Sequence, residues 1–264
     1  VLSEFGQAVG ERVEDHLEAE GVRVHCDTPV DALVGEDRVT AVRVGNERVP
    51  ADMALVGVGV RPNTDLLDDT GIERDGRGTV VVDRYGRTSA PDVYAAGDCA
   101  TAFHAVTGQR AWVPLGLTAN RAGRAVGTTV AGEPTPVGTT AGTAAVKAMA
   151  MEAGRTGLVD HGTAREAGFD PVSETITAGS RSGYYPGGSE TTVRLTADRG
   201  TGRLLGGAIV GRDRAAIRID TVATALEGGL TVGDLERSDL AYAPPFSPVW
   251  DPVLVAAKVL RGSL

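Results

Sequence analysis

The chain has 264 residues, of which 42% are hydrophobic and 23% are charged, as expected for one large or two ordinary globular domains. Its net charge of −9 disfavours nucleic acids and anionic membranes as partners, because both carry negative charge. No apolar run reaches the roughly 18 residues of a membrane helix and no signal peptide is visible, so we expect a cytoplasmic protein.

The chain begins with a helix, which is followed by strands. The helix is indicated by apolar residues at spacings of three and four, namely Leu2, Phe5, Val9, Val13 and Leu17. Gly21 is a natural stop for it. Val22–Cys26 then alternates like a strand, and residues 39–49 predict a β-ribbon turned at Gly45-Asn46. Met53–Val58 is apolar at nearly every position, which is typical of a buried parallel strand.

A glycine-containing segment follows that strand. Gly57 and Gly59 match the start of a dinucleotide-binding fingerprint, but Pro62 stands where its last glycine is required. No helix pattern follows either, so we reject the fingerprint. A plain turn at Pro62-Asn63 stays open as the alternative, and Thr79–Asp83 is predicted to form the next strand.

The most informative stretch is Thr88–Asp98. Pro91-Asp92 predicts a turn, Val93–Ala96 a short buried strand, and Gly97 and Asp98 lie at its C-terminal end. Ligands bind at this end of strands in open α/β sheets. Small residues allow a ligand to approach the backbone, and a carboxylate accepts hydroxyl hydrogen bonds. We therefore expect a ligand contact at Asp98.

The rest of the chain predicts one long helix and then an α+β arrangement. Leu115–Val130 reads as an Ala- and Gly-rich helix, and we expect a domain boundary near Thr139–Thr143, after the linker at 132–136. Later strands are predicted at Ala144–Ala150, Val172–Thr177, Thr191–Thr196 and Leu204–Val210, with a hairpin turn at residues 198–202. Later helices are predicted from a Thr163 cap to Gly168, at Ala215–Glu227, and from an Asp251 cap to about Lys258.

No metal site is expected. Cys26 and Cys99 form no CxxC pair, so we expect both to be buried and reduced. The remaining candidates, His16, His25 and His161, show no metal-ligand spacing, and His104 is expected to be a surface or loop residue.

Three stretches together resemble the FAD-dependent pyridine nucleotide-disulfide oxidoreductases. Thr88–Asp98 resembles their second flavin-binding motif, and Trp112–Arg124 resembles the helix beside the flavin. Tyr242–Pro252 is similar to the C-terminal signature of the coenzyme A-disulfide reductase and NADH oxidase branch. The resemblance extends from about residue 1 to residue 260.

The resemblance implies an incomplete α/β FAD/NAD(P)-binding Rossmann-like portion followed by an α+β dimerisation domain. Residues 1–72 would be the C-terminal half of the NAD(P)-binding domain, 73–138 the second part of the FAD-binding domain, and 139–264 the dimerisation domain. It also implies hydride transfer from NAD(P)H to FAD and on to a cysteine-centred acceptor, in a homodimer.

Cofactor contacts follow from the same resemblance. Gly97 and Asp98 would bind the FAD ribityl chain, and Gly59 would pass near the nicotinamide. The backbone at Leu117 and Thr118 would stabilise negative charge on the reduced flavin, with simple helix capping as the alternative.

Substrate contacts are implied as well. Tyr242 would reach across the dimer to the partner's flavin and cysteine, with Tyr184 as its companion. Asn120 and Trp250 match positions that line the coenzyme A pocket of this branch. Interface packing is the alternative role for both tyrosines.

Several parts of such an enzyme are absent from the sequence. No G-x-G-x-x-G and no redox cysteine beside a flavin motif are present, and the chain opens at Val1. We therefore expect a C-terminal fragment that is inactive alone and binds FAD weakly or not at all.

Two other functions were weighed. A non-catalytic dimerisation scaffold is the main alternative, although scaffolding requires neither Asp98 nor Tyr242. A relative acting on peroxide or ferredoxin is disfavoured by the tyrosine loop. Coenzyme A disulfide, other disulfides or persulfides, and dioxygen stay open as acceptors, and so do NADH and NADPH as donors.

Overall fold

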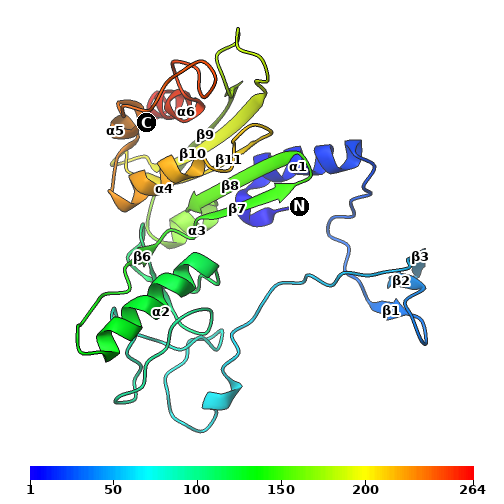
Figure 1. Ribbon diagram of the computed structural model, residues 1–264, viewed down its shortest axis with the longest axis vertical. Helices are drawn as coiled ribbons and strands as arrows, with labels where there is room; N and C mark the ends of the chain where they lie inside the picture. The colour runs from blue at the N-terminus through cyan, green and yellow to red at the C-terminus, as the bar shows by residue number, and fades with distance from the viewer.

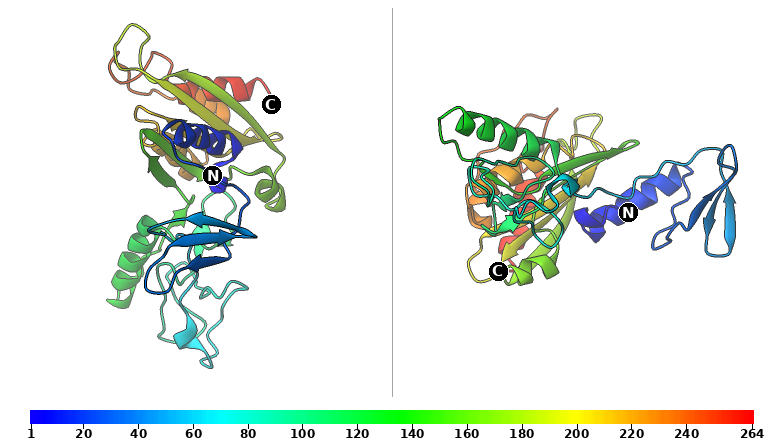
Figure 2. Two further views of the ribbon diagram at one scale, coloured as in Figure 1. Left: turned by 90° about the vertical axis from the view of Figure 1, so that its right-hand side faces the viewer. Right: turned by 90° about the horizontal axis from the view of Figure 1, so that it is seen from below.

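The computed structural model describes all 264 residues and divides them into three parts (Figure 1). The C-terminal part is a five-stranded antiparallel sheet with helices on both faces, and a loop-rich region with one long helix precedes it. The N-terminal part consists of a helix that packs on the sheet and a small β-ribbon that stands apart from it (Figure 2).

The large sheet has the strand order β7-β8-β11-β10-β9. Its strands are β7 (Ala144–Ala148), β8 (Met151–Gly157), β9 (Pro171–Gly179), β10 (Glu190–Asp198) and β11 (Leu204–Gly211). The predicted strands β7, β9, β10 and β11 are confirmed, with ends that differ by at most two residues. The hairpin turn that joins β10 to β11 is confirmed as well. The prediction lacks β8, because its sequence mixes Glu, Gly and Arg with few apolar residues and does not alternate.

The main hydrophobic core lies on one face of this sheet and contains 22 buried residues. Three helices cover that face: α4 (Ile219–Glu227), α5 (Val232–Glu236) and α6 (Pro252–Arg261). Helix α6 packs on β9 and β10, and α4 packs on β11 and β8. Val193 and Ile209 lie opposite each other in β10 and β11, so their side chains point to the same face of the sheet. Both side chains are fully buried there.

A second, smaller core of eight residues lies on the other face. There α1 (Gln7–Ala19) packs Val9 and Val13 against Ala208 and Val210 of β11. The apolar face expected for this helix is therefore confirmed. Because helices cover both faces, β11 is buried along its whole length.

Several helix boundaries differ from the prediction. Helix α1 begins at Gln7 rather than Leu2, α4 begins at Ile219 rather than Ala215, and α6 ends at Arg261 rather than Lys258. The short helix α3 (His161–Glu166) is capped by Asp160, which accepts the Thr163 amide, so the predicted cap at Thr163 is wrong. None of these helices combines the length and apolar character needed to cross a membrane.

The loop-rich region contains the long helix α2 (Gly116–Val130), which confirms the prediction to within one residue. Beside it, short strands pair in the order β5-β4-β6. These strands are β4 (Ala102–His104), β5 (Arg110–Ala111) and β6 (Thr139–Thr140). The 3₁₀ turn η2 (Asp65–Leu67) lies at the start of the region.

Two predicted strands of this region are wrong. Residues 79–83 and 93–96 form only isolated bridges, from Val80 to Arg74 and Ala100 and from Tyr94 to Arg87. Turns follow each stretch within a few residues, so no ladder develops. Val93 is 38% exposed, in contrast to the burial predicted for it.

The N-terminal ribbon consists of β1 (Ala32–Val34), β2 (Ala41–Val44) and β3 (Glu47–Pro50). Its predicted turn at residues 45–46 is confirmed. Residues 22–26 form no strand, and Cys26 is exposed rather than buried. Cys99 is half-buried.

The buried parallel strand predicted at Met53–Val58 is also wrong. These residues form no regular element, and the Leu55 side chain is 97% exposed. A parallel strand needs neighbours for its backbone groups, and no other strand of this chain runs alongside. The apolar pattern is thus real, but the pairing that would bury it is absent.

The buried position of Leu195 in β10 leads to a first prediction. We expect Leu195→Ala to lower the free energy of unfolding by about 2–5 kcal/mol, because it opens a cavity in the main core. Urea denaturation followed by circular dichroism would measure the change. Leu66→Ala is the matched control, since Leu66 is 81% exposed and should change stability by less than about 0.5 kcal/mol. Equal effects of the two substitutions would contradict this core assignment.

Candidate functional site

Asp98 lies in a tight turn beside α2. Gly97 has φ +90°, a left-handed conformation that favours glycine, and its carbonyl accepts the Ala100 amide at 3.0 Å. The backbone oxygen of Asp98 accepts Trp112 Nε1 at 2.8 Å, which fixes the turn. The Asp98 side chain is exposed, so its carboxylate is available to accept hydrogen bonds from a ligand.

The N-terminus of α2 lies close to this turn. A Cβ added at Gly97 would lie 3.7 Å from that of Ala119, so the two segments approach closely. Leu115, the N-cap residue, provides no side-chain hydrogen bond to the first-turn amides. Leu117 is 70% exposed, and the Thr118 hydroxyl is 3.2 Å from that of Thr140. The helix therefore presents uncapped amides and its positive dipole end beside Asp98.

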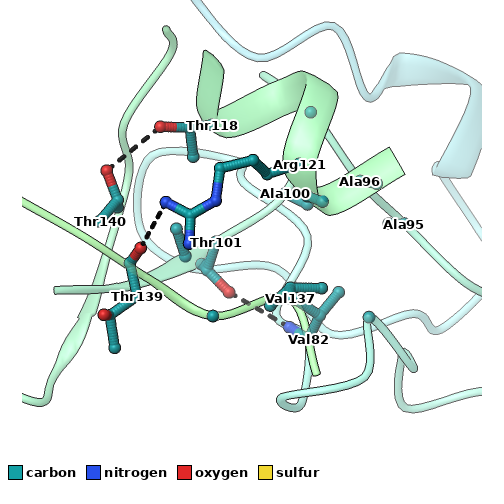
Figure 3. A pocket seen from close by; sticks show the side chains of 15 residues that line it. Val82, Ala95, Ala96, Ala100, Thr101, Thr118, Arg121, Val137, Thr139 and Thr140 are labelled. Atoms are coloured by element: carbon teal, nitrogen blue, oxygen red, sulfur yellow. Dashed lines mark hydrogen bonds between the residues drawn. The ribbon is translucent and has the colours of Figure 1, made fainter. Parts of the chain in front are cut away.

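A small, partly open cavity lies behind the turn (Figure 3). Ala95 and Ala96 line one side, and Arg121 of α2 reaches across to donate to the Thr139 carbonyl at 3.2 Å. Its volume of about 20 Å³ is close to that needed by one water molecule. A ligand of nucleotide size therefore does not fit inside, and the exposed surface around Asp98 and the helix end is the part open to it.

Two tyrosines far apart in sequence meet elsewhere in the molecule. Tyr184 and Tyr242 bring their hydroxyl oxygens to 3.4 Å of each other, and their side chains are 76% and 46% exposed. The hydrogen bond between the two hydroxyls raises the pKa of the Tyr184 phenol. These are the two tyrosines singled out from the sequence, and the structure places them together.

The tyrosine pair and the Asp98 turn lie far apart within one chain. The loop joining β9 to β10, which carries Tyr184, is at one end of the molecule, and α2 is at the other (Figure 1). The perpendicular view shows the same separation (Figure 2). A ligand bound at the Asp98 turn of one chain is thus remote from the tyrosines of that chain.

An ion pair holds the base of the Tyr184 loop. Arg181 donates Nε and Nη2 to the two carboxylate oxygens of Asp213, at 2.7 and 2.8 Å. Ser180 Oγ donates to the same carboxylate at 2.7 Å. The Arg181 hydrogen bond, with help from Ser180, holds the pKa of Asp213 below its usual value.

The remaining predicted residues lie outside these contacts. Gly59 has φ +94° and sits on the exposed segment before η2, where an added Cβ would meet no atom within 4 Å. Asn120 is exposed on α2. Trp250 is 50% exposed and has Lys258 Nζ at 5.5 Å from its ring centroid, a cation–π contact that the sequence analysis did not identify.

His104 is not the surface or loop residue that was predicted. It lies in β4 and is half-buried, and its Nδ1 accepts the amides of Val106 and Thr107 at 3.3 and 3.4 Å. Burial, reinforced by Arg155, lowers the pKa of His104.

Comparisons with known proteins show the family to which this fold belongs. The pyridine nucleotide-disulphide oxidoreductase model matches residues 1–123, and the dimerisation domain model of the same name matches residues 143–252. The chain belongs to the pyridine nucleotide-disulphide oxidoreductase family.

Individual relatives indicate to which branch of the family the chain is most similar. The chain is 36% identical over 258 residues to the NAD(P)H sulfur oxidoreductase (CoA-dependent) of Pyrococcus furiosus, covering 98% of this chain and 57% of the relative. It is 40% identical over 229 residues to the NAD(P)H coenzyme A polysulfide/persulfide reductase of Pyrococcus horikoshii, covering 87% and 51%. Coenzyme A disulfide reductases and NADH oxidases are among the other relatives.

A solved structure gives the same result. An NAD-dependent persulfide reductase from A. fulgidus superimposes with a TM-score of 0.90 and 34% identity, covering 97% of this chain and 47% of that one. The predicted family, its branch and the fold class are therefore confirmed. The chain spans about half the length of the relatives it matches.

The Asp213 ion pair leads to a second prediction. Because its folded-state pKa lies below the unfolded value of about 3.9, ionised Asp213 stabilises the native state above that pH. The contribution is lost as the pH falls through the folded-state pKa. We expect Asp213→Asn to cost about 1–3 kcal/mol near pH 7 and clearly less near pH 3.

Urea denaturation at both pH values would measure this difference. Asp239→Asn is the control, because Asp239 is exposed and forms no ion pair, so stability should change little at either pH. A penalty for Asp213→Asn that is the same at both pH values would show that the carboxylate charge is not responsible.

Proposed function

We propose that the chain serves a flavin-dependent NAD(P)H oxidoreductase of the coenzyme A-disulfide reductase and NADH oxidase type. Such an enzyme would transfer hydride from NAD(P)H to FAD, and the reduced flavin would then reduce a cysteine-centred acceptor. Family membership and the names of the archaeal relatives support this proposal. Those relatives are named for coenzyme A-linked sulfur chemistry, which favours a disulfide or persulfide as the acceptor. Dioxygen is the second candidate, because NADH oxidases are also relatives.

The proposal divides the chain as the sequence suggested. Residues 1–72 belong to the NAD(P)-binding part, 73–138 to the second part of the FAD-binding domain, and 139–264 to the dimerisation domain. The last boundary falls in the gap between the two family matches, which supports it. Gly59 would then pass near the nicotinamide, and the protein would work as a cytoplasmic homodimer.

The residues around Asp98 fit FAD. The free Asp98 carboxylate suits the ribityl hydroxyls, and Gly97 leaves room for a ligand to approach the backbone. The uncapped amides of Leu117 and Thr118 suit a ring edge that gains negative charge. Bound FAD supplies the two-electron chemistry, whereas these residues hold and orient it.

The observation that carries the proposal is the tyrosine pair. A phenol can donate a hydrogen bond or a proton to a thiolate, and a second phenol beside it orients the first. Tyr184 and Tyr242 are exposed and paired, and the loop joining β9 to β10 lies at the opposite end of the molecule from α2 (Figure 1). In a homodimer they would face the FAD and acceptor of the other protomer. Asn120 and Trp250 would contact the substrate, with Lys258 beside Trp250 suited to an anionic one such as coenzyme A disulfide.

A third prediction tests the tyrosine pair. In the complete FAD-loaded enzyme that the chain is proposed to serve, we expect Tyr242→Phe to lower kcat by roughly a hundredfold and to change KM less, because it removes a proton donor from the reaction. NAD(P)H oxidation with coenzyme A disulfide, polysulfide or dioxygen as acceptor measures this.

Tyr185→Phe is the matched control for that assay. Tyr185 is the sequence neighbour of Tyr184, but its hydroxyl has no partner in the pair. Its loss should leave kcat within about a factor of two, since no bond to the reacting groups is removed. If Tyr242→Phe behaves like this control with every acceptor, Tyr242 has only a packing role.

A fourth prediction tests the flavin contact. We expect Asp98→Asn to raise the dissociation constant for FAD by about tenfold, which is the cost of one charge-assisted hydrogen bond. Fluorescence titration at high protein concentration would measure it, because binding to this chain is expected to be weak. Asp92→Asn is the control, as Asp92 is an exposed carboxylate in the preceding turn. If the two variants bind FAD with the same affinity, the Asp98 carboxylate does not contact FAD.

A further inference from the structure

The two tyrosines sit on separate irregular loops. Tyr184 lies in the loop at residues 180–189, between β9 and β10, and Tyr242 lies in the loop at residues 237–251, between α5 and α6. No backbone hydrogen bond joins one loop to the other. Their relative position, and with it the 3.4 Å contact between the hydroxyls, therefore depends on side chains.

One side chain bridges both loops. Arg218, just before α4, donates from a single nitrogen, Nη2, to the Ser180 carbonyl at 2.7 Å and to the Phe246 carbonyl at 3.0 Å. Ser180 begins the first loop, and Phe246 lies four residues after Tyr242 in the second. The two hydrogens of Nη2 are thus divided between the two loops.

The other nitrogens of Arg218 anchor it to the scaffold. Its Nε donates to Asp251 Oδ2 at 3.1 Å, and its Nη1 donates to the Asp213 carbonyl at 3.2 Å. The Asp251 carboxylate also accepts the Val253 amide at 2.9 Å and so caps α6. The side chains of Arg218 and Asp251 are only 10% and 13% exposed, so water competes little for these bonds.

A guanidinium is the group that can do this. It is planar and carries five donors in fixed directions, so the two loop carbonyls cannot move relative to each other without losing a bond. A lysine ammonium offers one nitrogen and cannot reach Asp251, Asp213, Ser180 and Phe246 at once. The only other polar link between the loops apart from the tyrosines is the Ser182 hydroxyl, 3.4 Å from the Ser247 carbonyl.

We propose that Arg218 is a positioning residue that holds the loops of Tyr184 and Tyr242 in register, so that the two hydroxyls stay in contact. Its importance for turnover rests on the proposed function, but the geometry it sets does not. Nothing in the sequence motifs identifies Arg218, since it lies outside both loops.

Tyrosine titration in the 264-residue chain tests this proposal. With tyrosine labelled at ¹³Cζ, NMR follows each phenol through ionisation, and Tyr184→Phe assigns the Tyr184 signal among the five tyrosines. In the unaltered chain Tyr242 raises the pKa of Tyr184. We expect Arg218→Lys and Arg218→Gln to lower that pKa to the value found in Tyr242→Phe, because the contact opens.

Hydrogen exchange gives a second readout. Amides of both loops should exchange about tenfold faster in Arg218→Lys, whereas those of β10 and β11 should not change. Arg237→Lys is the control, since Arg237 is 67% exposed and its only side-chain contact is Asp234. It should change neither the titration nor the exchange.

These measurements test the positioning role of Arg218 independently of the activity assay that tests the proposed function. Arg218→Lys keeps a cation beside Asp251 and should fold, so an unfolded Lys variant would make Arg218 a folding residue and overturn the proposal. A folded Lys variant with the unaltered Tyr184 titration would overturn it as well. If the titration shifts as expected but Tyr242→Phe retains full activity, the positioning role stands and the proposed function fails.

Discussion

The central strand β11 is the constraint on which the rest of the structure depends. All eight of its residues are buried, with β8 and β10 hydrogen-bonded on its two sides and helices on its two faces. A Cβ at Gly206 would lie 2.5 Å from the Leu158 carbonyl oxygen, and one at Gly207 would lie 2.8 Å from Leu195. Glycine is required at Gly206 because the Leu158 backbone lies too close for any side chain, and at Gly207 a larger residue would have to displace the Leu195 side chain.

This packing fixes the distance between the two candidate regions. The Tyr184 loop joins β9 to β10 at one edge of the sheet, and the Tyr242 loop joins α5 to α6 on one face. Strand β6 connects the sheet to α2 and the Asp98 turn. A sheet with two covered faces does not bend enough to bring its ends together. The proposed chemistry needs the tyrosines beside a flavin, so within this geometry a second protomer has to supply one of the two.

The sequence predicted what local chemistry determines. Strand β7 alternates between more and less exposed residues, the hairpin turn has Gly202 at φ +68°, and Asp251 followed by proline begins a helix. The pairing of Tyr184 with Tyr242 came only from the family resemblance, because 58 residues separate them. The predictions that failed depended on neighbours. Residues 53–58 have the composition of a buried strand, but composition does not show whether a partner strand is present.

The interactions that hold the tyrosine loops differ in how much they contribute to the stability of the fold. A hydrogen bond between two exposed hydroxyls 3.4 Å apart contributes little to folding, because water replaces it readily. The network below it is different, since the Arg218–Asp251 ion pair is almost completely buried and a buried ion pair is costly to desolvate. Such a pair is favourable when its donors are used, and here four of the five N–H groups of Arg218 have acceptors. The strong interactions therefore lie at the base of the loops and the weak one at their tips. That distribution suits a surface whose hydroxyls must be held in place before a partner or substrate arrives, because the ordering cost is then met on folding rather than on binding.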